Sequence, residues 1–135
     1  MERKREPQRI LFIVYRLPAR RVVHVVMVDR KTKRALAQQT AAILGRTARL
    51  FGTSRRPWTQ MLAALQAYGW KPTKIRQAFL EEFERACRKE GARVLRGAVQ
   101  PRLARSYQHW SGFRDSGKRM HTPVGELIVL EKVLT

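Results

Sequence analysis

The chain has 135 residues, and its 29 Lys and Arg residues outweigh 10 Asp and Glu residues to give a net charge of +19. A chain of this length buries about two-thirds of its unfolded surface and can form its own core, but so high a charge opposes compaction and predicts a polyanionic partner. The single cysteine, Cys87, excludes an internal disulfide and a zinc cluster of thiolates, and no apolar run reaches the roughly 20 residues of a membrane span. We expect a basic arm over residues 1–9 and a single compact RNA-binding domain over residues 10–135.

Two strand-like runs follow the basic arm. Ile10–Leu17 and Val22–Val28 are rich in β-branched and aromatic residues, and the short segment between them contains Pro18, which cannot continue a strand. Together these runs predict a β-hairpin. Its second strand is apolar on both faces except at His24, which we expect to be a core histidine.

The central element is predicted to be a helix over Lys33 to Phe51, capped by Thr32 and closed by Gly52. Its apolar residues recur at the spacing of one helical face, and they are Leu36, Thr40, Ile43, Leu44, Thr47, Leu50 and Phe51. Gly45 within the span disfavours a helix by about 1 kcal/mol relative to Ala. We expect this face in the core and the arginines of the same stretch at the surface.

Three further helical patterns follow, at Trp58 to Gly69, at Thr73 to Gly91 and at Pro101 to Trp110. The second of them turns its apolar residues inward, and they are Ile75, Phe79, Phe83, Ala86 and Cys87. It turns Glu81, Glu82 and Glu84 outward, where they pair with nearby arginines. The residues between the second and third helices, 92–100, fit a strand or a helix.

The last part of the chain is predicted to be a loop over Ser111 to Lys118 and a strand over Glu126 to Leu134. The simplest place for this strand is beside the N-terminal hairpin, since two strands rarely persist alone. The expected fold class is α+β, with an N-terminal β-hairpin and a C-terminal strand packed with about three to four helices.

Catalytic and metal-binding patterns are weak. Residues 112–118 have the glycine spacing of a phosphate-binding P-loop, but Arg119 stands where a magnesium-binding Ser or Thr is required. The three histidines, at positions 24, 109 and 121, are too scattered for a metal site, and Asp29 and Asp115 are single acids suited to turns. We expect no catalysis, no metal, no cofactor and no small-molecule substrate.

The cations are mostly arginine, whose planar fork suits phosphate contact and base stacking. Aromatic residues lie among them, and Trp110, beside a loop, fits core packing and base stacking equally well. The predicted RNA-binding residues are Arg3, Lys4, Arg5, Arg20, Arg21, Lys31, Lys33, Arg34, Arg46, Arg49, Arg55, Arg56, Arg102, Arg105, Trp110, Lys118 and Arg119.

The run Thr47-Ala48-Arg49-Leu50-Phe51-Gly52 resembles the opening signature of the mitochondrion-specific small ribosomal subunit protein thirty-three family. Trp58 to Gly69, Phe79 to Lys89 and a basic exit through Arg93 and Arg96 are similar in order to that family's central region. The Lys-rich tail that ends the family is missing, and the hairpin and the final strand are additional. The resemblance implies a non-catalytic component of the mitochondrial small subunit that binds ribosomal RNA and neighbouring ribosomal proteins.

The predicted function is therefore that of a structural ribosomal protein, located in mitochondria rather than on the cytoplasmic ribosome. Two alternatives stay open: an accessory structural subunit of another large organellar complex, and a free-standing nucleic-acid-binding regulator. A regulator should fold alone and discriminate between sequences. A ribosomal component should lose solubility without its RNA.

Overall fold

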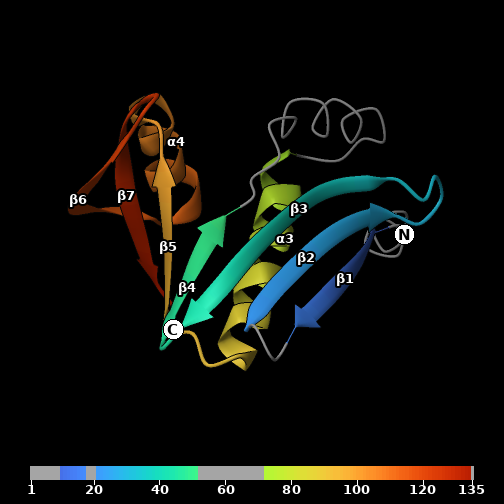
Figure 1. The fold of residues 1–135 in the computed structure, drawn as a ribbon. Coiled ribbons are helices and arrows are strands. Elements are labelled where there is room, and N and C mark those ends of the chain that lie inside the picture. The colour runs from blue at the N-terminus through green and yellow to red at the C-terminus, as the bar shows by residue number, and fades with distance from the viewer. Residues whose placement is uncertain (1–9, 18–20, 52–71, 135) are drawn as a thin grey trace.

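The computed structural model describes residues 10–17, 21–51 and 72–134, so the predicted arm at 1–9 and the predicted helix at Trp58 to Gly69 lie outside the described residues. Seven strands and two helices follow one another along the described chain (Figure 1). They are β1 (Ile10–Leu17), β2 (Val22–Asp29), β3 (Ala35–Leu44), β4 (Thr47–Phe51), α3 (Pro72–Lys89), β5 (Val94–Val99), α4 (Pro101–Ser111), β6 (Arg114–Thr122) and β7 (Gly125–Val133).

All seven strands belong to one sheet, in the order β1-β2-β3-β4-β5-β7-β6. Neighbouring strands are antiparallel, with β4 and β5 as the one parallel pair. Helix α3 connects these two parallel strands, and both helices lie on the same side of the sheet, behind the strands in Figure 1. We call this side the helical face and the opposite side the open face.

The core lies between the helical face and the two helices. On β2, Val23, Val25 and Met27 are fully buried while the alternate residues are only partly buried, which is the period of a strand packed on one face. Helix α3 contributes Phe83 and Cys87 to the same cluster. Burial raises the pKa of the Cys87 thiol to about 12. The expectation that Cys87 is a small core residue is therefore confirmed.

The prediction of a helix over Lys33 to Phe51 is wrong, because this stretch forms the hairpin of β3 and β4. Gly45 lies in the turn between them with φ +61°, a left-handed conformation that glycine adopts readily. On β3, Ala41 and Ile43 are buried together as alternate residues of a strand. The glycine that disfavoured the helix was thus the signal of a turn.

The expectation that Leu50 and Phe51 both belong to the core is also wrong. Leu50 points to the helical face but is only partly buried, and Phe51 points to the open face with 48% of its surface exposed. In a helix the two would share one face, whereas successive residues of a strand point to opposite faces. The helical interpretation therefore misplaced Phe51.

Other elements agree better with the sequence. The hairpin of β1 and β2, the helix at Thr73 to Gly91 and the helix at Pro101 to Trp110 are confirmed as β1–β2, α3 and α4. The end of the chain is a strand, but β7 pairs with β5 and β6 rather than with the N-terminal hairpin. Most of the predicted loop at 111–118 belongs to β6.

The predicted fold class is therefore wrong. The described chain is a seven-stranded mixed sheet with two helices on one face, not a hairpin and one strand packed with three to four helices. The error has one main cause, since reading β3 and β4 as a helix removed the strand that joins the two halves of the sheet. No helix among the described residues is long and apolar enough to cross a membrane.

Candidate functional site

The parallel pair of β4 and β5 opens toward its carboxyl end. Its register runs over three residue pairs and ends where Arg49 lies opposite Arg96. Beyond that point β4 continues to Phe51 and β5 to Val99, and no described strand pairs their facing edges. Figure 1 shows the two arrows diverging. The opening offers backbone N–H and C=O groups to a ligand that carries amides.

The amino end of α3 lies at the same end of the sheet as this opening. Because α3 connects two parallel strands, it runs back along them and begins on the side where β4 and β5 end (Figure 1). The unpaired N–H groups and the dipole of a helix amino end favour an anion. The first turn of α3 contains no acidic residue, so nothing there opposes a phosphate.

Gly97 lies beside the opening, and Tyr107 is partly buried on the helical side of the same sheet. Gly97 follows Arg96 on β5, and a Cβ atom added to it would lie 3.7 Å from the Cβ atom of Leu50. This separation is ordinary van der Waals contact, so only a side chain larger than that of alanine would crowd the space between the diverging strands. On α4, Tyr107 packs edge-to-face on Phe113, with ring centroids 6.2 Å apart. Burial raises the pKa of Tyr107, so its hydroxyl keeps its proton at neutral pH.

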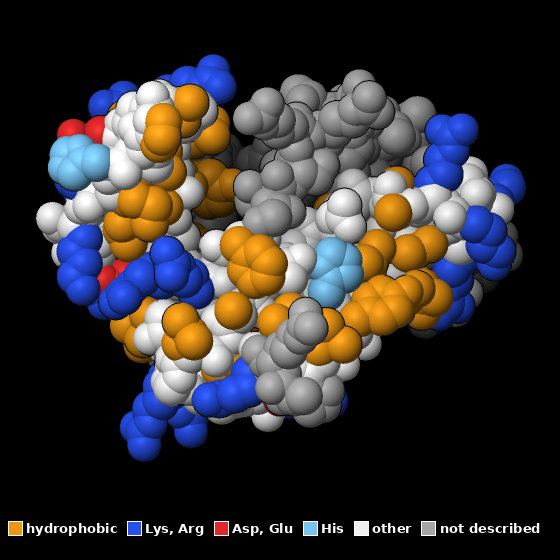
Figure 2. Space-filling view, in the orientation of Figure 1, with side chains coloured by type: hydrophobic (Ala, Val, Ile, Leu, Met, Phe, Trp, Pro, Cys, Tyr) orange, Lys and Arg blue, Asp and Glu red, His pale blue; other side chains and the backbone are white. Residues whose placement is uncertain are grey.

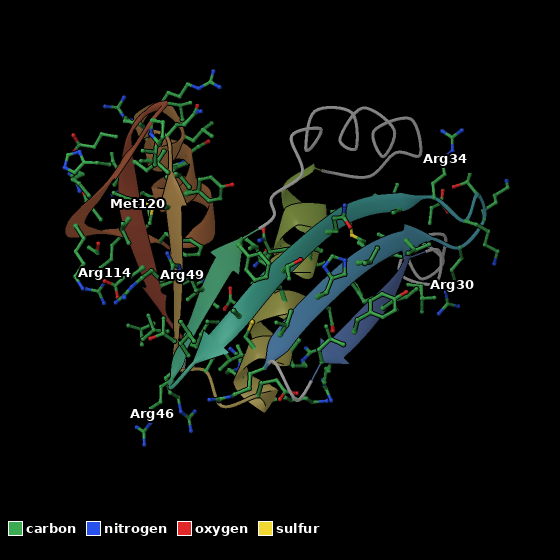
Figure 3. The ribbon with its side chains drawn as sticks, viewed as in Figure 1. Arg30, Arg34, Arg46, Arg49, Arg114 and Met120 are labelled. Carbon is green, nitrogen blue, oxygen red and sulfur yellow. The ribbon has the colours of Figure 1, made fainter. Side chains whose placement is uncertain are left out.

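Arginines flank the opening on the open face. The strand register places Arg49, Arg96, Glu131 and Arg114 side by side on β4, β5, β7 and β6. Arg96 Nη2 donates to Glu131 Oε2 at 3.3 Å, while Arg49 and Arg114 are exposed. Figure 3 shows Arg49 and Arg114 in the same part of the sheet. We call these four residues the arginine row, and three guanidinium groups against one carboxylate leave it positive.

Most of the predicted RNA-binding residues lie elsewhere. Six of them are outside the described residues, and they are Arg3, Lys4, Arg5, Arg20, Arg55 and Arg56. Lys31, Lys33 and Arg34 are exposed at the turn between β2 and β3, at the far end of the sheet from Arg46 (Figure 3). Arg21 Nη2 donates to the carbonyl oxygens of Gly45 at 3.4 Å and of Glu90 at 3.3 Å.

The remaining ones are on the elements that follow β5. Arg102 and Arg105 are exposed on α4, the helix that also contains Trp110. Lys118 and Arg119 are exposed on β6, and Arg119 Nη1 lies 2.9 Å from Asp115 Oδ1. This hydrogen bond lowers the pKa of Asp115. Arg49 alone lies at the opening, so the structure does not gather the set into one surface, and RNA binding through it stays a prediction.

The residues that matter most at the opening were not singled out from the sequence. Gly97 and Arg96 fall in residues 92–100, which the sequence left open between strand and helix. The local pattern Val-Leu-Arg-Gly-Ala-Val is that of a strand interrupted by glycine, which often marks a close approach of backbones. Within the described residues, no group of three or more His, Cys, Asp and Glu side chains could hold a metal ion.

Comparison with protein-family models and with curated protein sequences gave no match. Solved structures do match: a protein assigned to the GNAT acetyltransferase family, from Desulfovibrio desulfuricans, has a TM-score of 0.61 at 14% identity over 87% of this chain and 71% of its own. The chain has the acetyltransferase fold. Nourseothricin acetyltransferase shares the acetyltransferase fold with a TM-score of 0.62 at 9% identity, over 94% of this chain and 85% of its own. An aminoglycoside acetyltransferase in complex with coenzyme A and kanamycin gives 0.51 at 12%, over 87% and 72%.

These comparisons correct the functional predictions. No ribosomal family matches, and the structural neighbours are acetyltransferases, so the assignment to the small-subunit protein family is wrong. The predictions of a non-catalytic ribosomal constituent, of ribosomal RNA and neighbouring ribosomal proteins as partners, and of no small-molecule substrate are contradicted by the same neighbours. A mitochondrial location rested on that resemblance and stays a prediction.

The physical reason for the error lies in the motifs that carried the resemblance. In the first motif, Thr47–Phe51 is a β-strand here, and Phe79 to Lys89 is an amphipathic helix segment of a kind that many folds contain. High positive charge predicts an anionic partner but does not distinguish a ribosomal protein from an enzyme with an anionic ligand. Neither signal depends on the sheet topology that defines the acetyltransferase fold.

Proposed function

We propose that this protein is an acetyl-coenzyme A-dependent acetyltransferase. The observation that carries the proposal is the opening between β4 and β5, with the amino end of α3 at the same end of the sheet, within an acetyltransferase fold. In open sheets, ligands bind beyond the carboxyl ends of the strands, and this is the place where the sheet separates. The proposal replaces a ribosomal role with catalysis at a small-molecule site.

The residues present fit coenzyme A. The pantetheine arm contains two amides, which match the unpaired strand edges beyond Arg49 and Arg96. Its pyrophosphate suits the amino end of α3, whose first turn has no acidic residue. Gly97 leaves room between the strands, because a side chain at that position would approach Leu50.

When bound, the cofactor would supply an acetyl group, which would form a C–N bond to an amine acceptor as the C–S bond of the thioester breaks and the thiolate leaves. The strand edges of β4 and β5 would orient that group, and the short parallel pair below the opening would exclude water from one end. Tyr107 is partly buried on the helical side, and its raised pKa keeps a proton on Oη. We assign Tyr107 the role of proton donor to the departing thiolate.

Charge narrows the class of acceptor. One structural neighbour, the aminoglycoside acetyltransferase, is in complex with kanamycin, a polycation, whereas this chain has a net charge of +19. A field of that sign repels polycations and concentrates anions at the surface. The acceptor is therefore an amine carried by a neutral or anionic molecule rather than an aminoglycoside.

Calorimetric titration of the full-length protein with acetyl-coenzyme A tests the site. Gly97→Val should abolish measurable binding, since its side chain would fill the space beside Leu50. Ala98→Val is the matched control, because Ala98 points to the open face and the substitution adds a similar side-chain volume on that face. Absence of saturable binding to the wild-type protein, or equal loss in both variants, would contradict the proposal.

Tyr107→Phe tests the chemical step separately. It should leave acetyl-coenzyme A affinity unchanged and slow thiol release in the presence of an amine acceptor by about 10²-fold or more, as expected for loss of a general acid. Circular dichroism should show that the packing on Phe113 is retained, since only the hydroxyl is removed. An unchanged rate would contradict the role of Tyr107 as proton donor but would not contradict the proposed cofactor site.

A further inference from the structure

The open face of the sheet has unusual apolar exposure. Eight large hydrophobic residues are exposed within the described chain, and six of them point to this face by strand register. These six are Leu11, Tyr15, Leu17, Leu44, Phe51 and Val133. Figure 2 shows hydrophobic side chains across this face, with a histidine among them and Lys and Arg side chains beside them. Contiguous exposed apolar surface of this kind marks an interaction site.

Aromatic side chains cross this face in a straight line. The register aligns Tyr15, His24, Thr40 and Phe51 on the four successive strands β1 to β4. The Tyr15 and His24 rings have centroids 6.0 Å apart, and His24 Nδ1 lies 2.6 Å from Thr40 Oγ1, which fixes the imidazole. Tyr15 is 53% exposed and Phe51 48% exposed. We call these four residues the aromatic row.

The arginine row begins on β4, the strand on which the aromatic row ends, and it runs in the opposite direction across the sheet. On β4, Arg49 and Phe51 are two residues apart and share the open face, so they lie about 7 Å apart along the strand. Arg49 is followed across the sheet by Arg96, Glu131 and Arg114. One surface therefore presents rings over the half of the sheet from β1 to β4 and cations over the half from β4 to β6, and the two sets meet on β4.

The arginine row has three guanidinium groups and only one carboxylate, that of Glu131. Arg96 Nη2 is bonded to Glu131, but Arg96 Nε is buried and has no hydrogen-bond partner among the described residues. Within the same part of the chain, neither Arg49 nor Arg114 forms an ion pair. A buried donor without a partner is costly, and an ion is one of the few explanations for it in a native structure.

We propose that the open face binds single-stranded nucleic acid, with phosphates on Arg49, Arg96 and Arg114 and unpaired bases stacked on Tyr15, His24 and Phe51. Ring stacking beside phosphate contacts is how sheets bind single strands. A duplex hides its base faces and would use only the cations. A second copy of this chain is disfavoured as the occupant because two surfaces of a +19 protein repel each other. This proposal does not depend on acetyl transfer.

The test is fluorescence anisotropy of the full-length protein with a labelled single-stranded oligouridine of about 12 nucleotides and with a duplex of equal length, without coenzyme A. The single strand should bind more tightly. Tyr15→Leu and Phe51→Leu should each weaken that binding by about 5- to 150-fold, the range for loss of one stacked base. Leu44→Ala is the control on the same face, outside both rows, and should have little effect.

The arginine row is tested with Arg49→Gln/Arg114→Gln, against Arg102→Gln/Arg105→Gln as a control with the same loss of charge on α4. For single strands the slope of log affinity against log salt is about −0.7 per phosphate, so loss of two contacts should reduce its magnitude by about 1.4. The control pair should keep the slope of the wild-type protein. Circular dichroism of all variants identifies any that fail to fold.

Several outcomes would overturn the proposal. Equal affinity for duplex and single strand, together with no effect of the leucine substitutions, would show that binding is non-specific electrostatic attraction without base stacking. Equal competition by polyglutamate would do the same. If Arg49→Gln/Arg114→Gln weakens coenzyme A binding but not oligouridine binding, the arginine row serves the cofactor phosphates instead. That last result would contradict nucleic-acid binding and leave the proposed acetyltransferase function intact. Conversely, absence of acetyl-coenzyme A binding would contradict the acetyltransferase function, and the anisotropy result would still decide nucleic-acid binding.

Discussion

Large apolar residues lie on both faces of the sheet, but they are buried on the helical face and exposed on the open face. On the helical face, the alternate residues Val23, Val25 and Met27 of β2 are completely buried beneath α3. On the open face, Tyr15 and Phe51 are about half exposed. Apolar area removed from water stabilises a fold, but apolar area left in water does not, so the open-face residues contribute little to folding. Their presence is better explained by binding than by stability.

The charges divide in a similar way. On the helical side, Lys132 Nζ of β7 lies 2.7 Å from Glu84 Oε2 of α3, and both side chains are largely shielded from water. On the open face, the arginine row has more cations than carboxylates. On the helical side, therefore, the chain supplies a carboxylate partner for its shielded cation. The excess positive charge on the open face and beside the opening between β4 and β5 is suited to binding an anionic ligand.

The largest expected effect compares one phenylalanine from each face. Phe83→Ala should lower the free energy of unfolding by about 3 to 5 kcal/mol, because Phe83 is 1% exposed and its removal leaves a cavity. Phe51→Ala should cost less than about 1 kcal/mol, since Phe51 is already half exposed. Denaturant unfolding of the two variants measures both. Similar losses would show that the open face is packed by the chain and would remove the contrast between the faces.

The next effect concerns the ion pair that links α3 to β7. Glu84→Gln should lower the free energy of unfolding by about 1.5 to 3 kcal/mol, because the shielded Lys132 ammonium would lose its charged partner. Glu82→Gln is the matched control, since Glu82 pairs with the more exposed Arg85 along the helix, a contact worth about 0.2 to 0.5 kcal/mol. Equal losses would mean that burial does not distinguish these two pairs.

The smallest effect depends on pH. Burial raises the pKa of Cys87 to about 12 from 9.0, so its thiol ionises first in the unfolded chain. Stability should therefore be nearly constant well below pH 9 and fall as pH rises through 9, by about 1.4 kcal/mol at pH 10. Cys87→Ala should lack this specific loss. A thiol reagent at pH 8 should label the wild-type protein only on unfolding, and rapid labelling of the native state would contradict the burial.

Local patterns were sufficient for some elements of the fold. The β-branched run of β2 identifies a strand, and the apolar spacing from Phe79 to Cys87 identifies α3, because each depends on neighbours within the same element. At residues 33–51 the local pattern is ambiguous, because the apolar spacing fits one helix as well as two strands. The turn at Gly45 selects the two strands only when β3 and β4 pair with each other.

By itself, therefore, the amino-acid sequence determined the high positive charge, the terminal hairpin and helices, and the expectation of an anionic partner. Only the tertiary structure decided that β7 lies between β5 and β6, that β4 and β5 part after Arg49 and Arg96, and that Tyr15 lies in line with Phe51. These features join residues from distant parts of the chain, and no local periodicity contains them. The proposed cofactor site and the proposed nucleic-acid surface both depend on such long-range pairing, because each is assembled from the register of several strands.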